Sequence, residues 1–182
     1  MARVEAKHES GLIICLTGPE STGKTTLAAA LAAELGLPLV AEAARDYLRG
    51  RAGYEREDLL AIADAQLDAE ASMLASGAPV VLADTDLLVI QVWWEEKYGA
   101  LDIRISEALQ ARSARRYLLM QPDIPWAPDP QRESPFDRQR LYHRYQALLA
   151  ASEFPFAEIG GQGQDRLAAA RLQVLRWLKE VG

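Results

Sequence analysis

Short apolar runs alternate with helical patterns along most of the chain. Five runs have the length of buried strands, at residues 12–17, 37–41, 79–86, 115–121 and 155–160. Between them apolar residues recur at helical spacing, which predicts helices at about 24–35, from 42, at 57–74, 87–98, 105–111 and 137–151, and a last helix ending at 181. This alternation predicts an α/β fold in three layers, with a five-stranded parallel sheet flanked by helices.

The chain reads as one domain over residues 1–182, with a polar N-terminal tail at 1–10. Apolar residues make up 49% and charged residues 25% of the sequence, which is the composition of an ordinary globular domain. The segment at about 122–138 is too rich in proline and charge to belong to a core, and we expect it to form a lid.

Charge and cysteine content exclude several classes of function. The net charge is −6 and no run of like charges occurs, so no nucleic-acid partner is expected. No apolar run reaches the roughly 18 residues of a membrane helix, and the N-terminal segment lacks the apolar core of a signal peptide. We therefore expect a cytoplasmic protein with no membrane partner, and the sequence does not indicate its oligomeric state. The only cysteine, Cys15, reads as a small buried residue.

The stretch "LTGPESTGKTTLAAAL" at residues 16–31 carries the strongest chemical signal. Its spacing G-x-x-x-x-G-K-[ST] is that of a phosphate loop, and it lies between an apolar strand and an Ala/Leu-rich helix, as a P-loop NTPase domain requires. Backbone amides and a lysine would hold the phosphates and a threonine hydroxyl would reach Mg²⁺. ATP with Mg²⁺ is the expected cofactor, although the pattern leaves GTP open. The predicted cofactor-binding residues are Gly18, Glu20, Ser21, Thr22, Gly23, Lys24, Thr25 and Thr26.

Two carboxylates follow the predicted strand at 79–86. Asp84 is in the position of the acidic residue that supports a magnesium shell together with Thr25, and Asp86 lies on the same face of an extended chain. Asp86 could instead cap the next helix. We keep Asp84 as a metal-shell and catalytic residue.

A second acidic position follows the strand at 37–41. Glu42 and Arg45 are spaced i, i+3 and could simply form an exposed ion pair. Because this strand end borders the same sheet edge as the phosphate loop, Glu42 could also accept the proton of a substrate hydroxyl.

The proline-rich segment supplies cations to the same chemistry. Arg132 and Arg138 could stabilise the developing charge of phosphoryl transfer from a mobile lid, with Lys24 as the third catalytic cation. The alternative is a solvated loop with surface charges.

The tryptophans indicate a flat binding surface. Trp93 and Trp94 are adjacent on a helix, so they cannot both face the core, and we take Trp94 as the substrate-side residue. Trp126 lies among prolines, where no regular face would bury it, whereas Trp177 reads as core.

Together, "GPESTGKTTL", "AEAARDYL", "VVLADTDLL" with a later "KYG", and "PDIPWAPDPQR…DRQ" resemble the ribosylnicotinamide kinase domain of NadR-type proteins over about residues 12–149. The resemblance implies ATP-dependent phosphorylation of the 5′-hydroxyl of nicotinamide riboside, giving nicotinamide mononucleotide for NAD salvage. Longer family members carry further domains ahead of the kinase, and with about eleven residues before the first strand we expect neither adenylyl transfer nor repressor activity. The residues it implies around the substrate are Glu42, Arg45, Asp84, Asp86, Trp94 and Trp126, with Arg132 and Arg138 in the lid.

Two alternatives stay open. The first keeps the kinase chemistry and changes the acceptor to another nucleoside or a small alcohol. The second is a regulatory P-loop ATPase that transfers phosphate only to water and acts through a protein partner.

Overall fold

A single parallel sheet organises the chain. The computed structural model describes residues 11–127 and 136–181, and the side chains of residues 11–127 and 136–180. The strands are β1 (Leu12–Thr17), β2 (Leu39–Val40), β3 (Val80–Asp84), β4 (Arg115–Met120) and β5 (Phe156–Ile159). They pair in the order β2-β3-β1-β4-β5, with parallel registers throughout.

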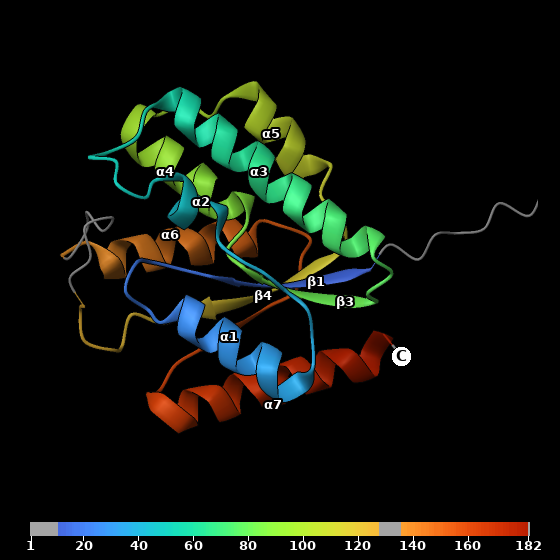
Figure 1. Cartoon of the computed structure of the whole chain (residues 1–182). Helices are drawn as coiled ribbons and strands as arrows, with labels where there is room; N and C mark the ends of the chain where they lie inside the picture. The colour runs from blue at the N-terminus through green and yellow to red at the C-terminus, as the bar shows by residue number, and fades with distance from the viewer. Residues whose placement is uncertain (1–10, 128–135, 182) are drawn as a thin grey trace, which may run out of the picture.

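Helices cover both faces of this sheet (Figure 1). One face carries α1 (Lys24–Leu35) and α7 (Gly163–Val181). The opposite face carries the remaining helices, which are α2 (Ala43–Tyr47), α3 (Arg56–Ala75), α4 (Leu87–Tyr98), α5 (Ile103–Gln110) and α6 (Arg138–Ala150).

Alternation along the strands divides the core into two layers. Leu12, Ile14 and Leu16 of β1 pack with residues of α1 and α7, including Trp177, which is core as expected. Ile13 and Cys15, which point the other way, pack with α4 and α6. All six residues of β1 are buried, so the central strand is apolar on both faces.

A third apolar cluster lies away from the sheet. Residues of α2, α3, α4 and α5 pack together there, with Leu59, Ile62 and Trp94 among its buried members. This cluster fixes α2 and α3 relative to α4, and α2 begins directly after Glu42. It therefore holds the second strand end near the phosphate loop.

The three-layer fold expected from the sequence is confirmed. The strand at 12–17 and the helices at 24–35 and 87–98 have the predicted limits. The second strand is shorter than predicted, at two residues, because only Leu39 and Val40 pair with β3. The fifth helix begins two residues earlier than predicted, because the Asp102 side chain caps it by accepting from the Arg104 amide.

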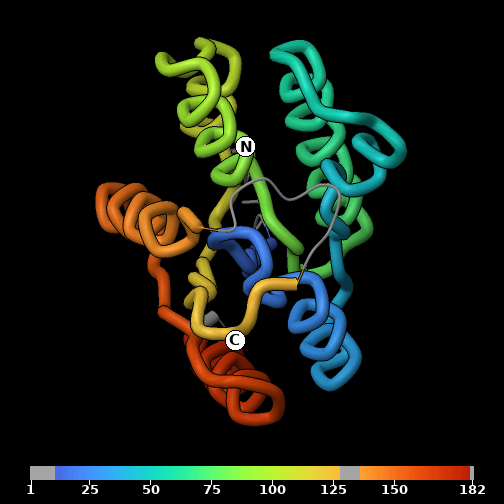
Figure 2. The backbone as a smooth tube through the Cα atoms, turned by 90° about the vertical axis from the view of Figure 1, so that its left-hand side faces the viewer, coloured from blue at the N-terminus to red at the C-terminus, as the bar shows by residue number. Residues whose placement is uncertain are grey.

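Parallel pairing places the carboxyl ends of all strands at one edge of the sheet. The phosphate loop follows β1, the central strand, and lies beside the segment 121–127 that follows β4 (Figure 2). The Ala127 amide donates to Ser21 Oγ at 2.8 Å across this junction. The lid predicted at about 122–138 lies partly outside the described residues. Among the described helices, none combines the length and apolar character needed to span a membrane.

Candidate active site

The phosphate loop is held in a conformation that only particular residues allow. Gly18 has φ 129° and Gly23 has φ 77°, both outside the usual range of residues with side chains. Ser21 also has a positive φ, of 55°, and is buried. A Cβ at Gly18 would lie 2.9 Å from the carbonyl oxygen of Met120, so the loop passes directly against the end of β4. The Thr22 hydroxyl closes the loop internally by donating to the Pro19 carbonyl at 2.9 Å.

Lys24 places a positive charge inside this loop. Its ammonium donates to the carbonyls of Gly18 at 2.9 Å and Pro19 at 2.7 Å. It is also the first residue of α1, whose first turn carries no acidic residue. The positive end of the helix dipole and the ammonium therefore act on the same space, which suits an anion.

Asp84 faces the loop from the end of β3. Its side chain accepts a hydrogen bond from Thr25, while its Oδ1 atom is buried without a hydrogen-bond partner among the described residues. Burial raises the pKa of Asp84, and the Thr25 hydrogen bond and the Lys24 charge partly oppose the rise. A buried carboxylate oxygen with no donor beside an exposed threonine hydroxyl fits the oxygen-ligand preference of Mg²⁺. Among the described residues, no three His, Cys, Asp or Glu side chains gather as a metal cluster, so a magnesium ion here would rely on few protein ligands.

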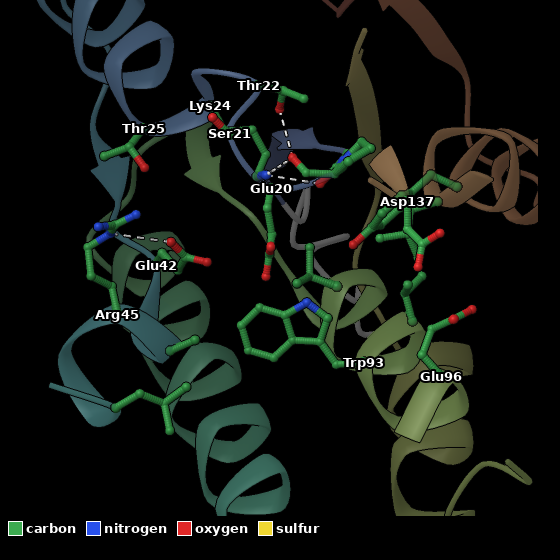
Figure 3. Close-up of a pocket in the computed structure, with 18 of the residues that line it drawn as sticks. Glu20, Ser21, Thr22, Lys24, Thr25, Glu42, Arg45, Trp93, Glu96 and Asp137 are labelled. Atoms are coloured by element: carbon green, nitrogen blue, oxygen red, sulfur yellow. Dashed lines mark hydrogen bonds and ion pairs between the residues drawn. The ribbon is translucent and has the colours of Figure 1, made fainter. Parts of the chain in front are cut away.

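Glu42 approaches the same point from the end of β2. Burial raises the pKa of its carboxyl group above the ordinary value; the Lys24 and Arg45 charges lower it in part, and the nearby Asp84 raises it further. Arg45 lies 3.5 Å from Glu42 and is 43% exposed at its side chain. Both interpretations of the sequence therefore hold. Glu42 and Arg45 form the i, i+3 ion pair, and both residues also line the cleft beside the phosphate loop (Figure 3).

The phosphate loop lies at a cleft of about 590 Å³, and residues of α2 and of α4 form two of its walls. All eight predicted cofactor-binding residues line it, together with Glu42 and Arg45. Glu96 and Asp137 lie on the opposite wall, and the Trp93 ring lies between the two walls (Figure 3). Trp93 stacks on Tyr54 with ring centroids 5.5 Å apart and an interplanar angle of 20°. On the opposite wall Glu96 and Asp137 are paired with Arg140, so that wall carries charges of both signs. The cleft therefore offers a phosphate-binding end, a wall of mixed charge and a flat aromatic surface.

The prediction that Trp94 lines the substrate site is wrong. Trp94 is 4% exposed, packs in the cluster of α2 to α5, and donates from its indole nitrogen to the Ala100 carbonyl at 2.9 Å. Adjacent helical positions differ by about 100°, so burying Trp94 directs Trp93 into the cleft. The sequence indicated that one of the two faces a cleft but did not decide which.

The predicted substrate role of Asp86 is also corrected. Its carboxylate caps α4 by accepting from the Leu88 amide at 2.9 Å, which is the alternative that the sequence left open. It also accepts from Arg115 at 2.7 Å, from Arg112 at 2.9 Å and from the Tyr117 hydroxyl at 2.7 Å. Against the effect of burial, these cations and hydrogen bonds lower the pKa of Asp86. The side chain is 1% exposed and all its bonds are internal, so it does not reach the cleft.

The segment after β4 is attached to the phosphate loop by arginines. Arg138 donates to the carbonyls of Ser21 at 3.2 Å and Ile124 at 2.9 Å, and lies over the Trp126 ring at 5.7 Å from its centroid. The sequence did not single out Arg166 of α7, which donates to the carbonyls of Thr22 at 2.6 Å and Gly161 at 2.7 Å.

Trp126 is half-buried and is not among the residues that line the cleft, so its substrate contact stays a prediction. Arg132, the other predicted lid arginine, lies outside the described residues.

Comparison with known proteins agrees with this geometry. A family model described as an AAA domain matches residues 13–166. No curated protein matches the sequence significantly. Among solved structures, a NadR protein in complex with NR has a TM-score of 0.75 at 20% identity, covering 91% of this chain and 51% of that chain. A NadR protein in complex with NAD and AMP-PNP has a TM-score of 0.70 at 19% identity, covering 91% and 49%. Deoxyadenosine kinase from M. mycoides, with products dCMP and a flexible dCDP, has a TM-score of 0.63 at 12% identity, covering 90% and 99%.

These matches establish the fold. The chain has the P-loop α/β fold of nucleoside and nucleotide kinases, and it spans about half the length of the NadR chains. At identities this low, the likeness identifies neither the acceptor nor the reaction.

Proposed function

Since the chain belongs to the AAA-domain family, we propose that it is an ATP- and Mg²⁺-dependent kinase that phosphorylates a hydroxyl group of a nucleoside-like small molecule. The observation that carries this proposal is the meeting of two carboxylates with the phosphate loop. Asp84 lies at Thr25, and Glu42 lies close enough to Lys24 and Asp84 for their charges to shift its pKa. A protein that only bound a nucleotide would not need a second buried carboxylate at this point.

The phosphate tail of ATP fits the loop end of the cleft. Backbone amides of the loop between Gly18 and Thr25 would hold the phosphates, and Lys24 would add its positive charge there. Thr25 and Asp84 are the residues that would hold Mg²⁺, which supplies neutralisation of the phosphate oxygens when bound. Most of the catalytic effect would then come from positioning and electrostatics in the cleft.

Glu42 is the residue best suited to receive the acceptor's proton. Its burial raises its pKa, and a less acidic carboxylate is a better base near neutral pH. The hydroxyl group would be oriented between Glu42 and Asp84, in line with the terminal phosphorus. Arg45, at the mouth of this wall, is placed to contact the acceptor or the transferred group.

The favoured acceptor is nicotinamide riboside, phosphorylated at its 5′-hydroxyl to give nicotinamide mononucleotide. The motif resemblance supports it, and so does the fold likeness to a NadR protein in complex with NR. The Trp93–Tyr54 stack offers a flat surface on which a heteroaromatic ring could lie. Another nucleoside or a small alcohol would use the same chemistry, and the fold likeness to deoxyadenosine kinase supports testing nucleosides first.

An ADP-release assay over a panel of acceptors tests this proposal. With ATP and Mg²⁺, nicotinamide riboside is expected to accelerate ADP release well above hydrolysis by water, and Lys24→Ala should abolish the acceleration. Acceleration by a different nucleoside alone would keep the kinase and replace the acceptor. ATP hydrolysis unaffected by every acceptor would favour the regulatory ATPase.

A further inference from the structure

Gln66 is a buried polar residue on the apolar side of α3. It is 3% exposed and shares the core-facing stripe with Leu59, Ile62 and Ala63. A glutamine at such a position must satisfy both ends of its amide within the protein, because burying an unpaired amide is costly.

The Gln66 amide bonds to the backbone next to Glu42, which lines the cleft, and to the backbone next to Asp84, which is buried at the end of β3. Its Oε1 accepts from the Ala43 amide at 3.0 Å, and Ala43 directly follows Glu42. Its Nε2 donates to the Thr85 carbonyl at 3.4 Å, and Thr85 directly follows Asp84. The Gln66 amide can accept from one backbone and donate to the other, whereas an ionised carboxylate lacks the donor and a thioether has no donor and is only a weak acceptor.

The Thr85 turn needs such support. Thr85 is β-branched and has φ 70°, a conformation that costs such a residue free energy and persists only when its surroundings impose it. Its amide donates to the Leu16 carbonyl at 3.0 Å, and the following Asp86 is fixed by Arg112, Arg115 and Tyr117. Together with the pairing of Val40 with Ala83, the two Gln66 bonds join this turn to the Glu42 turn.

We propose that Gln66 is a positioning residue, which sets the separation of Glu42 and Asp84 by joining the two turns that carry them. The inference rests on the proposed function, because it assigns a catalytic consequence to that separation. Gln66 does not line the cleft, so it acts through the two backbones and not on the substrate. An error of about 1 Å in the placement of catalytic groups can cost a hundredfold in rate.

The test compares Gln66→Met, which keeps the length of the side chain and loses the bonds to both turns and the bond to Glu70, with Leu67→Ala on the same helix. Leu67 packs against the α2–α5 cluster and contacts neither turn through a hydrogen bond that the structure describes, so its truncation controls for general loss of stability. We expect Gln66→Met to lower kcat by about ten- to a hundredfold, leave the KM for ATP within about twofold and raise the Mg²⁺ concentration needed for half-maximal rate. Leu67→Ala should leave all three within about twofold.

A second readout needs neither ligand nor turnover. Amide hydrogen exchange at Ala43, whose donor bonds to Gln66, should accelerate at least about tenfold in ligand-free Gln66→Met and stay unchanged in Leu67→Ala. Equal kcat in Gln66→Met and wild type, equal losses in the two variants, or unchanged exchange at Ala43 would overturn the proposal. If Gln66→Met does not fold, Gln66→Glu, which keeps the acceptor and loses the donor, should still lower kcat, and wild-type kcat in it would overturn the proposal.

The two proposals fail in different ways. A wild-type protein that phosphorylates no acceptor removes the proposed function, and the Ala43 exchange then decides whether Gln66 joins the turns.

Discussion

Replacing Gly18 by alanine perturbs the nucleotide site through a single methyl group. Gly18 is the first glycine of the phosphate loop, with φ 129°, where the new Cβ would lie 2.9 Å from the Met120 carbonyl oxygen and 3.2 Å from the Met120 amide nitrogen. Both neighbours are backbone atoms of β4, which pairs with the central strand. They cannot yield as the end of a flexible side chain would, so the loop itself must move.

The cost has two parts. A residue with a side chain in a conformation reserved for glycine loses about 1–3 kcal/mol, and an added methyl group in a tight contact loses about 1–3 kcal/mol more. A loss of about 2–6 kcal/mol corresponds to a fall in Tm of about 4–24 °C for a chain of this size. Because the loop amides are displaced, nucleotide affinity should fall by about tenfold or more.

Gly36→Ala is the matched control. Gly36 caps α1 with φ 65°, has no other atom within 4 Å of the new Cβ, and does not line the cleft. It should lose about 1–2 kcal/mol from the left-handed backbone alone and keep wild-type nucleotide affinity. Thermal unfolding by circular dichroism and titration calorimetry with a non-hydrolysable ATP analogue measure both quantities. Wild-type affinity in folded Gly18→Ala would refute the assignment of this loop to the phosphates.

Three further substitutions separate binding from turnover. Lys24→Ala should abolish turnover and leave Tm nearly unchanged, since the ammonium donates to carbonyls of the phosphate loop and Lys24 belongs to none of the three apolar clusters of the core; a large fall in Tm would contradict this. Glu42→Gln should abolish turnover yet raise the free energy of unfolding at neutral pH, because a carboxyl group whose pKa is raised by folding destabilises the native state when it is ionised. This gain in stability should shrink as the pH falls toward the pKa of the carboxyl group in the unfolded chain. Urea unfolding at several pH values measures the gain. Arg138→Ala should lower kcat by about a hundredfold with a smaller effect on ATP affinity, measured by steady-state kinetics and calorimetry. A silent variant would show that Arg138 only joins the phosphate loop to the segment 121–127 and takes no part in turnover.

The fold could be predicted because its signals are local. The apolar run at 12–17 is long enough for a buried strand, and the Gly23–Lys24 start and Gly36 end of the first helix follow from the conformational freedom of glycine. The short second strand was harder to delimit, because its limits depend on which residues pair with β3 rather than on its own composition.

In the candidate site, too, some residues could be predicted from local signals and others could not. The phosphate-loop residues follow from one contiguous motif, and the strand-end carboxylates Glu42 and Asp84 follow from parallel topology. The assignments of Trp94 and Asp86 failed because they depend on the direction of the side chain. Asp86 forms ion pairs with Arg112 and Arg115, which lie far from it in the sequence.

Gln66 was missed, although a signal was present. Positions 59, 62, 63 and 66 form one helical stripe, and a glutamine among its apolar residues is a polar group placed in the core. Arg166 gave no comparable signal, because its partners lie far from it in the sequence: they include the Thr22 and Gln121 carbonyls and the Asp123 carboxylate.

The central claim is that Glu42 and Asp84 direct an acceptor hydroxyl group at the phosphate held by the loop. A crystal structure with Mg²⁺, AMP-PNP and nicotinamide riboside measures this directly. The account predicts the triphosphate in the loop at Lys24 and a ribose hydroxyl oxygen within about 3.2 Å of a carboxylate oxygen of Glu42 or Asp84. A triphosphate bound in the loop with the acceptor hydroxyl groups turned away from both carboxylates, or a loop without phosphate, would contradict it.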